Sequence, residues 1–164
     1  MEEQSVKCLS TALFVLTLAD AASAAEWEYH RNENPMTSEV TDTFAFLKNP
    51  SPPYGTIIVA NRKDGGIDAS VDFSAASVDC PKTCRILVRA DESAPRTFDV
   101  SGGRNNMEFL DPFAFIEYIR DAKRVRVQFR FENTPHNQFK GEVVSTFYAE
   151  APLVIHPLRK GVGQ

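Results

Sequence analysis

Five basic side chains gathered within eleven residues are the most promising binding chemistry in this chain. They are Arg120, Lys123, Arg124, Arg126 and Arg130. The last three alternate with apolar residues, so a strand would carry them on one face, in a ridge roughly 20 Å long at about 3.3 Å per residue. Such a ridge suits an acidic protein or the phosphate and carboxylate groups of a cell envelope. Alternatively, Glu142 and other acids on the neighbouring strand neutralise it.

The other reactive side chains follow no catalytic or metal-binding pattern. His30, His136 and His156 lie far apart in the sequence, without the i, i+4 spacing of a helical metal site, so surface positions are favoured for them. No serine lies in a nucleophile-elbow glycine pattern, and the segment 101–103 is typical of a turn. We therefore expect no catalytic residues, no metal and no cofactor.

A mild acidic patch is formed by Asp64, Asp68 and Asp72. Asp68 and Asp72 share one face of a predicted strand, and Asp64 precedes it. Carboxylate oxygens of this kind can bind calcium in an oxygen-rich exterior. A solvated strand face explains the same pattern and is favoured.

Cys80 and Cys84 are separated by only three residues, Pro81 to Thr83. In an exported protein this spacing predicts a disulfide that closes a tight turn. The alternatives are half of a zinc site, for which no nearby His or Cys supplies the other ligands, and a redox-active pair, whose usual motif has two intervening residues.

The first 24 residues have the pattern of a cleaved secretory signal peptide. An apolar run over positions 12–19 is followed by Ala22-Ser-Ala24, a small-residue pattern that suits cleavage after Ala24 or Ala25. The run is too short to span a bilayer, which needs roughly 20 apolar residues. Glu2 and Glu3 make the start of this leader unusually acidic. We expect a periplasmic or secreted chain that does not span the membrane.

Length and composition indicate one folded domain. The chain has 164 residues, 43% of them hydrophobic, and 12 phenylalanines. Cleavage of the leader would change the net charge from −4 to −2, so the charge gives no sign of binding nucleic acid or an anionic membrane. We expect a single β-rich domain over residues 25–150 and an irregular, partly mobile tail over 151–164.

The elements that would position these side chains are mostly short strands. Strands are expected over 26–29, 40–47, 56–60, 67–73, 85–91, 96–100, 107–109, 124–131 and 138–148. The segment 56–60 is continuously apolar, which favours a strand buried on both faces. Asp111 followed by Pro112 predicts a helix over about 111–121, with Phe113, Phe115, Ile116 and Ile119 on its apolar side.

This pattern predicts a mainly β (α+β) fold. About eight strands with one helix before the last hairpin favour an antiparallel β-sandwich, or a curled sheet with the helix packed on it. The absence of a β-α-β alternation in the sequence argues against a nucleotide-binding doubly wound sheet.

Several short motifs resemble small exported proteins of Gram-negative bacteria, mostly of unknown function. The motifs are Trp27, Asn34-Pro-Met-Thr37, Cys80 with Cys84, Val88-Arg-Ala-Asp91, Phe115-Ile116 and Ala122-Lys-Arg-Val125. The wider group includes an accessory protein of type VI secretion. This chain departs from it at Asn34, where the group often has Asp, and at Ala90, where it often has Phe. The resemblance implies a periplasmic or secreted β-rich binding domain and assigns no catalytic residue.

The leading functional hypothesis is an exported, non-enzymatic binding module. It would act as an accessory, inhibitor or immunity-type protein on a macromolecular partner, most simply a protein of the envelope. The alternatives are an envelope hydrolase whose site is assembled only by the fold, and a structural component of a secretion assembly. An enzyme should have a pocket where a histidine meets a carboxylate or hydroxyl, whereas an assembly component should have a large exposed apolar surface.

Overall fold

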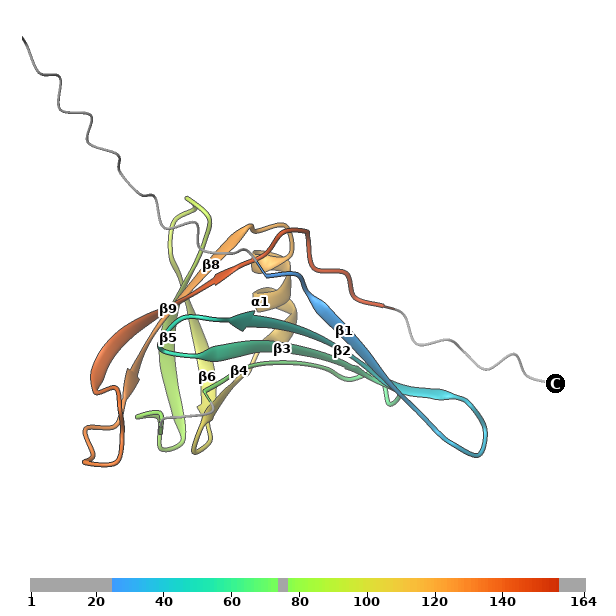
Figure 1. The fold of residues 1–164 in the computed structure, drawn as a ribbon, viewed down its shortest axis with the longest axis horizontal. Helices are drawn as coiled ribbons and strands as arrows, with labels where there is room; N and C mark the ends of the chain where they lie inside the picture. Colours follow the sequence, from blue (N-terminus) through green and yellow to red (C-terminus); the bar gives the residue numbers. More distant parts are fainter. Residues whose placement is uncertain (1–24, 74–76, 157–164) are drawn as a thin grey trace, which may run out of the picture.

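The computed structural model describes residues 25–73 and 77–156, and this part of the chain forms one nine-stranded antiparallel sheet with a single helix (Figure 1). The elements in chain order are β1 (Glu28–Glu33), β2 (Val40–Asn49), β3 (Gly55–Arg62), β4 (Ile67–Asp72), β5 (Thr83–Ala90), β6 (Arg96–Gly102), β7 (Asn106–Phe109), α1 (Pro112–Ile119), β8 (Arg124–Phe131) and β9 (Gly141–Tyr148). The expected leader over 1–24 and the end of the tail over 157–164 lie outside the described residues.

The sheet is strongly curved but not closed. Its strand order is β1-β2-β3-β4-β7-β6-β5-β8-β9, and the strands change direction markedly between β1–β4 and β5–β6 in Figure 1. A parallel bridge between Ala25 and Ala149 brings the two ends of the sheet together, and Asn49 Nδ2 donates a hydrogen bond of 2.9 Å to Ser145 Oγ nearby. The mainly β fold is therefore confirmed, in its form as one curled sheet rather than a two-sheet sandwich.

The helix forms where the sequence predicts it. Asp111 Oδ1 accepts a hydrogen bond of 3.0 Å from Ala114 N, and Pro112 occupies the first turn. Phe115, Ile116 and Ile119 are buried, and Phe115 stacks on Phe109 of β7. Phe113 was expected on the same apolar side, but it is 62% exposed, because the helix is only eight residues long and buries a single narrow stripe.

The alternation of β8 is also confirmed. Val125, Val127, Phe129 and Phe131 are buried, and the residues between them face away from the core. Full-length antiparallel pairing joins β8 to β9, as expected for the final hairpin. The rings of Phe129 and Phe131 both contact Phe73, so the aromatic core ties this hairpin to the end of β4.

Two details of the N-terminal half differ from expectation. The first strand begins at Glu28, beyond the buried Trp27, and runs to Glu33. β3 is fully buried on one face, where Ile57 and Val59 point into the core, whereas on the opposite face Ala60 is buried and Ile58 is only half-buried. The prediction of burial on both faces is therefore correct for part of the strand only.

The cysteine turn lies where β5 begins. Cys80 and Cys84 are joined by a disulfide with an S–S distance of 2.14 Å. Cys80 is buried, and its backbone carbonyl is packed so closely against Gly102 of β6 that a Cβ at that position would collide with it. The disulfide therefore lies in a tightly packed region, where the start of β5 meets the end of β6.

Residues 150–156 have no regular secondary structure, as expected for the tail, yet they contact the body of the protein. Leu153 is buried, and its N–H donates to the carbonyl of Arg120 at 2.8 Å. The carbonyl of His156 accepts hydrogen bonds from Thr43 Oγ1 and Asn61 Nδ2. Among the described residues, no helix is long and apolar enough to cross a membrane.

Candidate functional site: a basic hollow on the outer sheet face

Strand β8, which lies between β5 and β9, presents three of the predicted basic residues on the outer face of the sheet. Because alternate residues of β8 are buried, Arg124, Arg126 and Arg130 all project from the opposite face. The sequence analysis predicted this shared face. It did not predict β5 as the neighbour of β8, because β6, β7 and α1 separate the two strands in the chain.

The strand register sets a second arginine beside the first. Arg89 of β5 lies directly opposite Arg126 of β8 in the antiparallel ladder. Like charges at directly opposed positions destabilise a sheet. A nearby carboxylate or a bound anion reduces this repulsion. In the adjacent row, Leu87, Gln128 and Val144 are register partners across the three strands.

These two rows enclose a hollow of about 210 Å³, here called the basic hollow. Its lining residues are Leu87, Arg89, Pro95, Arg126, Gln128 and Val144. Leu87 and Val144 are 37% and 48% exposed, which is high for aliphatic side chains. The basic hollow thus combines two guanidinium groups with an apolar wall.

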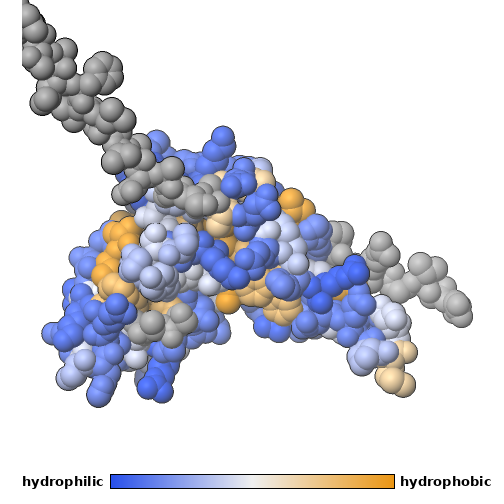
Figure 2. Space-filling view, viewed as in Figure 1, coloured by the Kyte–Doolittle hydropathy of each residue, from blue (hydrophilic) through white to orange (hydrophobic). Residues whose placement is uncertain are grey.

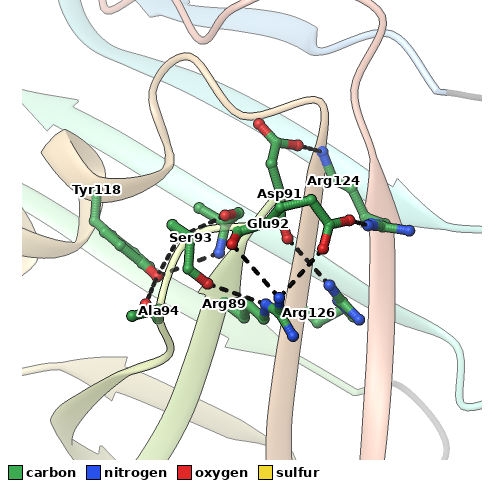
Figure 3. A network of polar contacts seen from close by, with 9 residues as sticks. Arg89, Asp91, Glu92, Ser93, Ala94, Tyr118, Arg124 and Arg126 are labelled. Atoms are coloured by element: carbon green, nitrogen blue, oxygen red, sulfur yellow. Dashed lines mark hydrogen bonds and ion pairs between the residues drawn. The ribbon is translucent and has the colours of Figure 1, made fainter.

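Glu92, in the turn between β5 and β6, is the acid closest to these arginines (Figure 3). Its carboxylate pairs with Arg124, and with Arg89 Nη2 at 3.2 Å. Arg89 Nε also donates to the carbonyl of Ser93 at 3.0 Å. The Glu92 side chain is 75% exposed, so each pair contributes only about 0–1 kcal/mol.

Asp91 connects the same turn to the start of β8. Its Oδ1 accepts hydrogen bonds from the backbone N–H groups of Lys123 and Arg124, at 3.0 and 2.8 Å. Its own backbone has a φ of 47°, a left-handed conformation that aspartate tolerates better than most residues. Asp91 therefore fixes where β8 begins and, with it, the position of the basic residues.

Arg126 differs from its neighbours because no carboxylate pairs with it among the described residues. Its Nη2 donates to the backbone carbonyl of Asp91 at 3.0 Å (Figure 3). Its Nε is buried and has no hydrogen-bond partner in the described part of the chain. A buried donor without an acceptor costs about 1–3 kcal/mol, more when the group is charged.

The remaining predicted basic residues lie outside the basic hollow. Arg130 is exposed and faces Glu142 in the register, but Glu142 Oε1 accepts its hydrogen bond from Gln128 Nε2, at 2.8 Å. Arg120 and Lys123 are exposed in the connection from α1 to β8. Glu92, from the turn before β6, forms an ion pair with part of the ridge, whereas Glu142 lies opposite Arg130 without a direct ion pair to it in the described residues.

The histidines are not brought together. His30 Nε2 lies 4.0 Å from Glu28 Oε2 on the exposed strand β1, and His136 is exposed in a loop. The ring of His156 packs edge-on against Tyr29. No group of three His, Cys, Asp or Glu side chains that could hold a metal ion occurs within residues 25–73 and 77–156.

Ion pairs shift the pKa of two groups on the strands β1–β4. Lys48 donates hydrogen bonds to Glu28 and lowers the pKa of that carboxyl. Asp68, at 2.5 Å from Arg62 Nε, raises the pKa of the guanidinium. Asp68 of the predicted acidic patch is thus held in an ion pair.

Sequence reasoning missed Glu92 and every lining residue of the basic hollow except Arg126, namely Leu87, Arg89, Pro95, Gln128 and Val144. Arg89 alternates with apolar residues on β5 as Arg126 does on β8, and this alternation was the available signal. The pairing of β5 with β8 was needed to connect the two. Figure 2 shows a mainly hydrophilic surface with separate apolar patches on the side that it draws.

Comparisons with protein-family models, with curated proteins and with solved structures found no match.

Proposed function

We propose that this chain is an exported, non-enzymatic binding module whose outer face on β5, β8 and β9 engages an acidic protein partner in the cell envelope. Its role would be that of an accessory, inhibitor or immunity-type protein. The observation that carries the proposal is the state of Arg126. Within the described residues this charged group has an unsatisfied donor and no paired acid, and it lies beside an exposed apolar wall. An acidic partner would supply what this arrangement lacks.

The disulfide supports the compartment in this proposal. Bonds between cysteines persist in oxidising surroundings and are rare in a reducing cytoplasm. Cys80 and Cys84 are bonded, and the leader predicted over 1–24 would direct the chain to such surroundings. These two features together support the periplasmic or secreted location in the proposal.

A binding role is favoured over the two alternatives by where the exposed groups lie. The large apolar side chains exposed in the described residues are spread over several elements, among them Met36, Tyr54, Leu110 and Val154, rather than collected on one face as an assembly surface would require. A hydrolase would need a base beside a nucleophile in a cavity, and no specific observation favours one here.

The experiment is an affinity capture from envelope extract with a chain that begins at residue 25. One bait is the wild-type sequence, and a second carries Arg124→Glu, Arg126→Glu and Arg130→Glu. A matched control makes the same change of charge on the other half of the sheet, at Arg31, Lys48 and Lys63, which lie in or beside exposed ion pairs of β1–β3.

The proposal expects one or more proteins to be captured by the wild-type and control baits and lost with the reversed-charge bait. Retention of every protein by the reversed-charge bait would exclude the basic face as the binding surface. Circular dichroism of each bait establishes that it is folded, and a milder bait with glutamine at the three positions replaces any that is not.

A further inference from the structure

We propose that the basic hollow binds one side-chain carboxylate of an extended peptide segment, with an aliphatic side chain two residues from that acid packed on Leu87 and Val144. The inference rests on the proposed function and specifies the chemistry that the partner must present. Arg126 is the anchor for the carboxylate, and Arg89 adds positive potential from the opposite strand.

The hydrogen-bonding capacity of Arg126 is mostly unused. A guanidinium has five N–H donors in a planar fork that matches a carboxylate. One donor, on Nη2, bonds to the Asp91 carbonyl, and Nε has no partner. Nε is buried, so a carboxylate in the basic hollow reaches it only once the Arg126 side chain has moved; the carboxylate then accepts from Nε and a terminal nitrogen together, in the bidentate geometry that arginine favours.

Arg89 is less available than Arg126 to bind a ligand. This difference limits the number of negative charges that the basic hollow can bind. Its Nε and Nη2 are already bonded to the Ser93 carbonyl and to Glu92. Arg126 has most of its donors available and Arg89 has its Nε and Nη2 already bonded, so together they suit a single anionic group. The site would therefore read one acid of a partner rather than a run of them.

Acids at both ends of the site exclude a long polyanion. Glu92 lies beside Arg89 and Arg124, and Glu142 lies beside Gln128, on the far side of the basic hollow. A nucleic acid or a polyphosphate placed along the strands would meet one of these carboxylates at each end. A single carboxylate between uncharged residues avoids both.

The apolar wall defines the residue two positions from that acid in the peptide. Leu87 and Val144 lie in the row beside Arg89 and Arg126, and Pro95 covers the end of the basic hollow nearest β6. Residues two apart in an extended peptide project to the same side, so a Val-Ser-Glu-Ser-Val sequence presents valine and glutamate side chains together. Burying a valine on this wall releases water from exposed Leu87 and Val144.

The test uses a blocked peptide, acetyl-Val-Ser-Glu-Ser-Val-amide, and its matched counterpart with glutamine in place of glutamate. Nuclear magnetic resonance of the arginine Nε–Hε groups follows binding directly at the relevant atom. The expected result is a saturable shift of the Arg126 signal with the glutamate peptide. Affinity for the glutamine peptide should be about tenfold lower or weaker still, as for loss of a charge-assisted hydrogen bond.

Variants separate the anchor from general charge. Arg126→Gln should reduce affinity for the glutamate peptide about tenfold, and Arg126→Lys should fall in between because lysine lacks the fork. Arg31→Gln, on the opposite half of the sheet, should leave the affinity for the glutamate peptide unchanged. Val144→Asp adds a charge at an exposed position without touching either arginine, and it should abolish binding even if the arginine variants fold poorly.

Equal affinity for the two peptides, no binding of either, or tighter binding of inorganic phosphate or a short oligonucleotide would overturn the inference. If that happens while the reversed-charge bait still loses its partner, the proposed function stands and only the carboxylate specificity falls. If the glutamate peptide binds at Arg126 while the reversed-charge bait keeps every partner, the proposed function falls.

Discussion

Arg89 and Arg126 face each other directly across the β5–β8 ladder, yet only Arg89 has a carboxylate, that of Glu92. The asymmetry arises from the chain path. The turn after β5 returns Glu92 to the side of Arg89 and Arg124, and it offers Arg126 only the backbone carbonyl of Asp91. Arg126 therefore has no carboxylate partner among the described residues.

The guanidinium of Arg126 should contribute little to the stability of the fold. Arg126→Met keeps the aliphatic stem and removes the guanidinium, together with its unsatisfied Nε and its repulsion from Arg89. We expect the free energy of unfolding to change by less than about 1 kcal/mol in urea denaturation, because the lost bond to Asp91 is offset by these gains. A loss above about 2 kcal/mol would show that Arg126 is structural.

Asp91 should behave in the opposite way. Asp91→Ala removes the acceptor for two backbone N–H groups at the start of β8 and places alanine at a φ of 47°. We expect a loss of about 2 kcal/mol in the free energy of unfolding. Asp91→Asn keeps an oxygen acceptor and tolerates the left-handed backbone, so it should lose clearly less. Equal losses for the two variants would contradict the role assigned to the carboxylate oxygen.

Two adjacent glycines allow a test of the packing around the cysteine turn. A Cβ at Gly102 would collide with the backbone carbonyl of Cys80, which cannot move without disturbing the turn. A Cβ at Gly103 would meet the side-chain oxygen of Asn106, which can rotate away. We expect Gly102→Ala to cost about 2–3 kcal/mol in thermal or urea unfolding and Gly103→Ala less than about 1 kcal/mol. The reverse order would refute the packing described here.

The pKa of Glu28 provides a test of strand β1. Because the Lys48 ammonium lowers this pKa, the pair stabilises the folded state at pH values above the pKa of the unfolded chain. That contribution is lost as the pH falls through the folded-state pKa. Lys48→Met should raise the pH at which the Glu28 carboxyl titrates, followed by its carbon resonance. Lys63→Met, whose partner is Glu39, serves as the control and should leave the Glu28 midpoint in place.

Local features of the fold followed from the sequence. The capped helix at Asp111, the alternation of β8 and the cysteine turn each depend on residues close together in the chain. Strand order did not follow, because β8 pairs with β5 only after α1 has carried the chain back across the sheet. Phe113 was assigned to the buried side for a similar reason. Periodicity shows which residues form an apolar stripe, but it does not show how much of that stripe the neighbouring strands cover.

The candidate site was predictable to the same extent. Arg124, Arg126 and Arg130 share a face because of alternation alone. Their partners depend on long-range pairing and on the geometry of one turn, which direct Glu92 toward Arg124 and leave Arg126 without an acid. Neither the apolar wall nor the second arginine can be inferred from β8 by itself.

The central claim is that the face carrying the basic hollow contacts a partner, and photo-cross-linking in envelope extract tests it most directly. A photoreactive amino acid is placed at Val144, beside the basic hollow, or at Val154 in the C-terminal segment. These side chains are 48% and 51% exposed, so they are matched in access. We predict a discrete cross-linked protein from position 144 that Arg126→Gln removes, and none from position 154. The same adduct from position 154, or an adduct from position 144 that persists in Arg126→Gln, would contradict the claim.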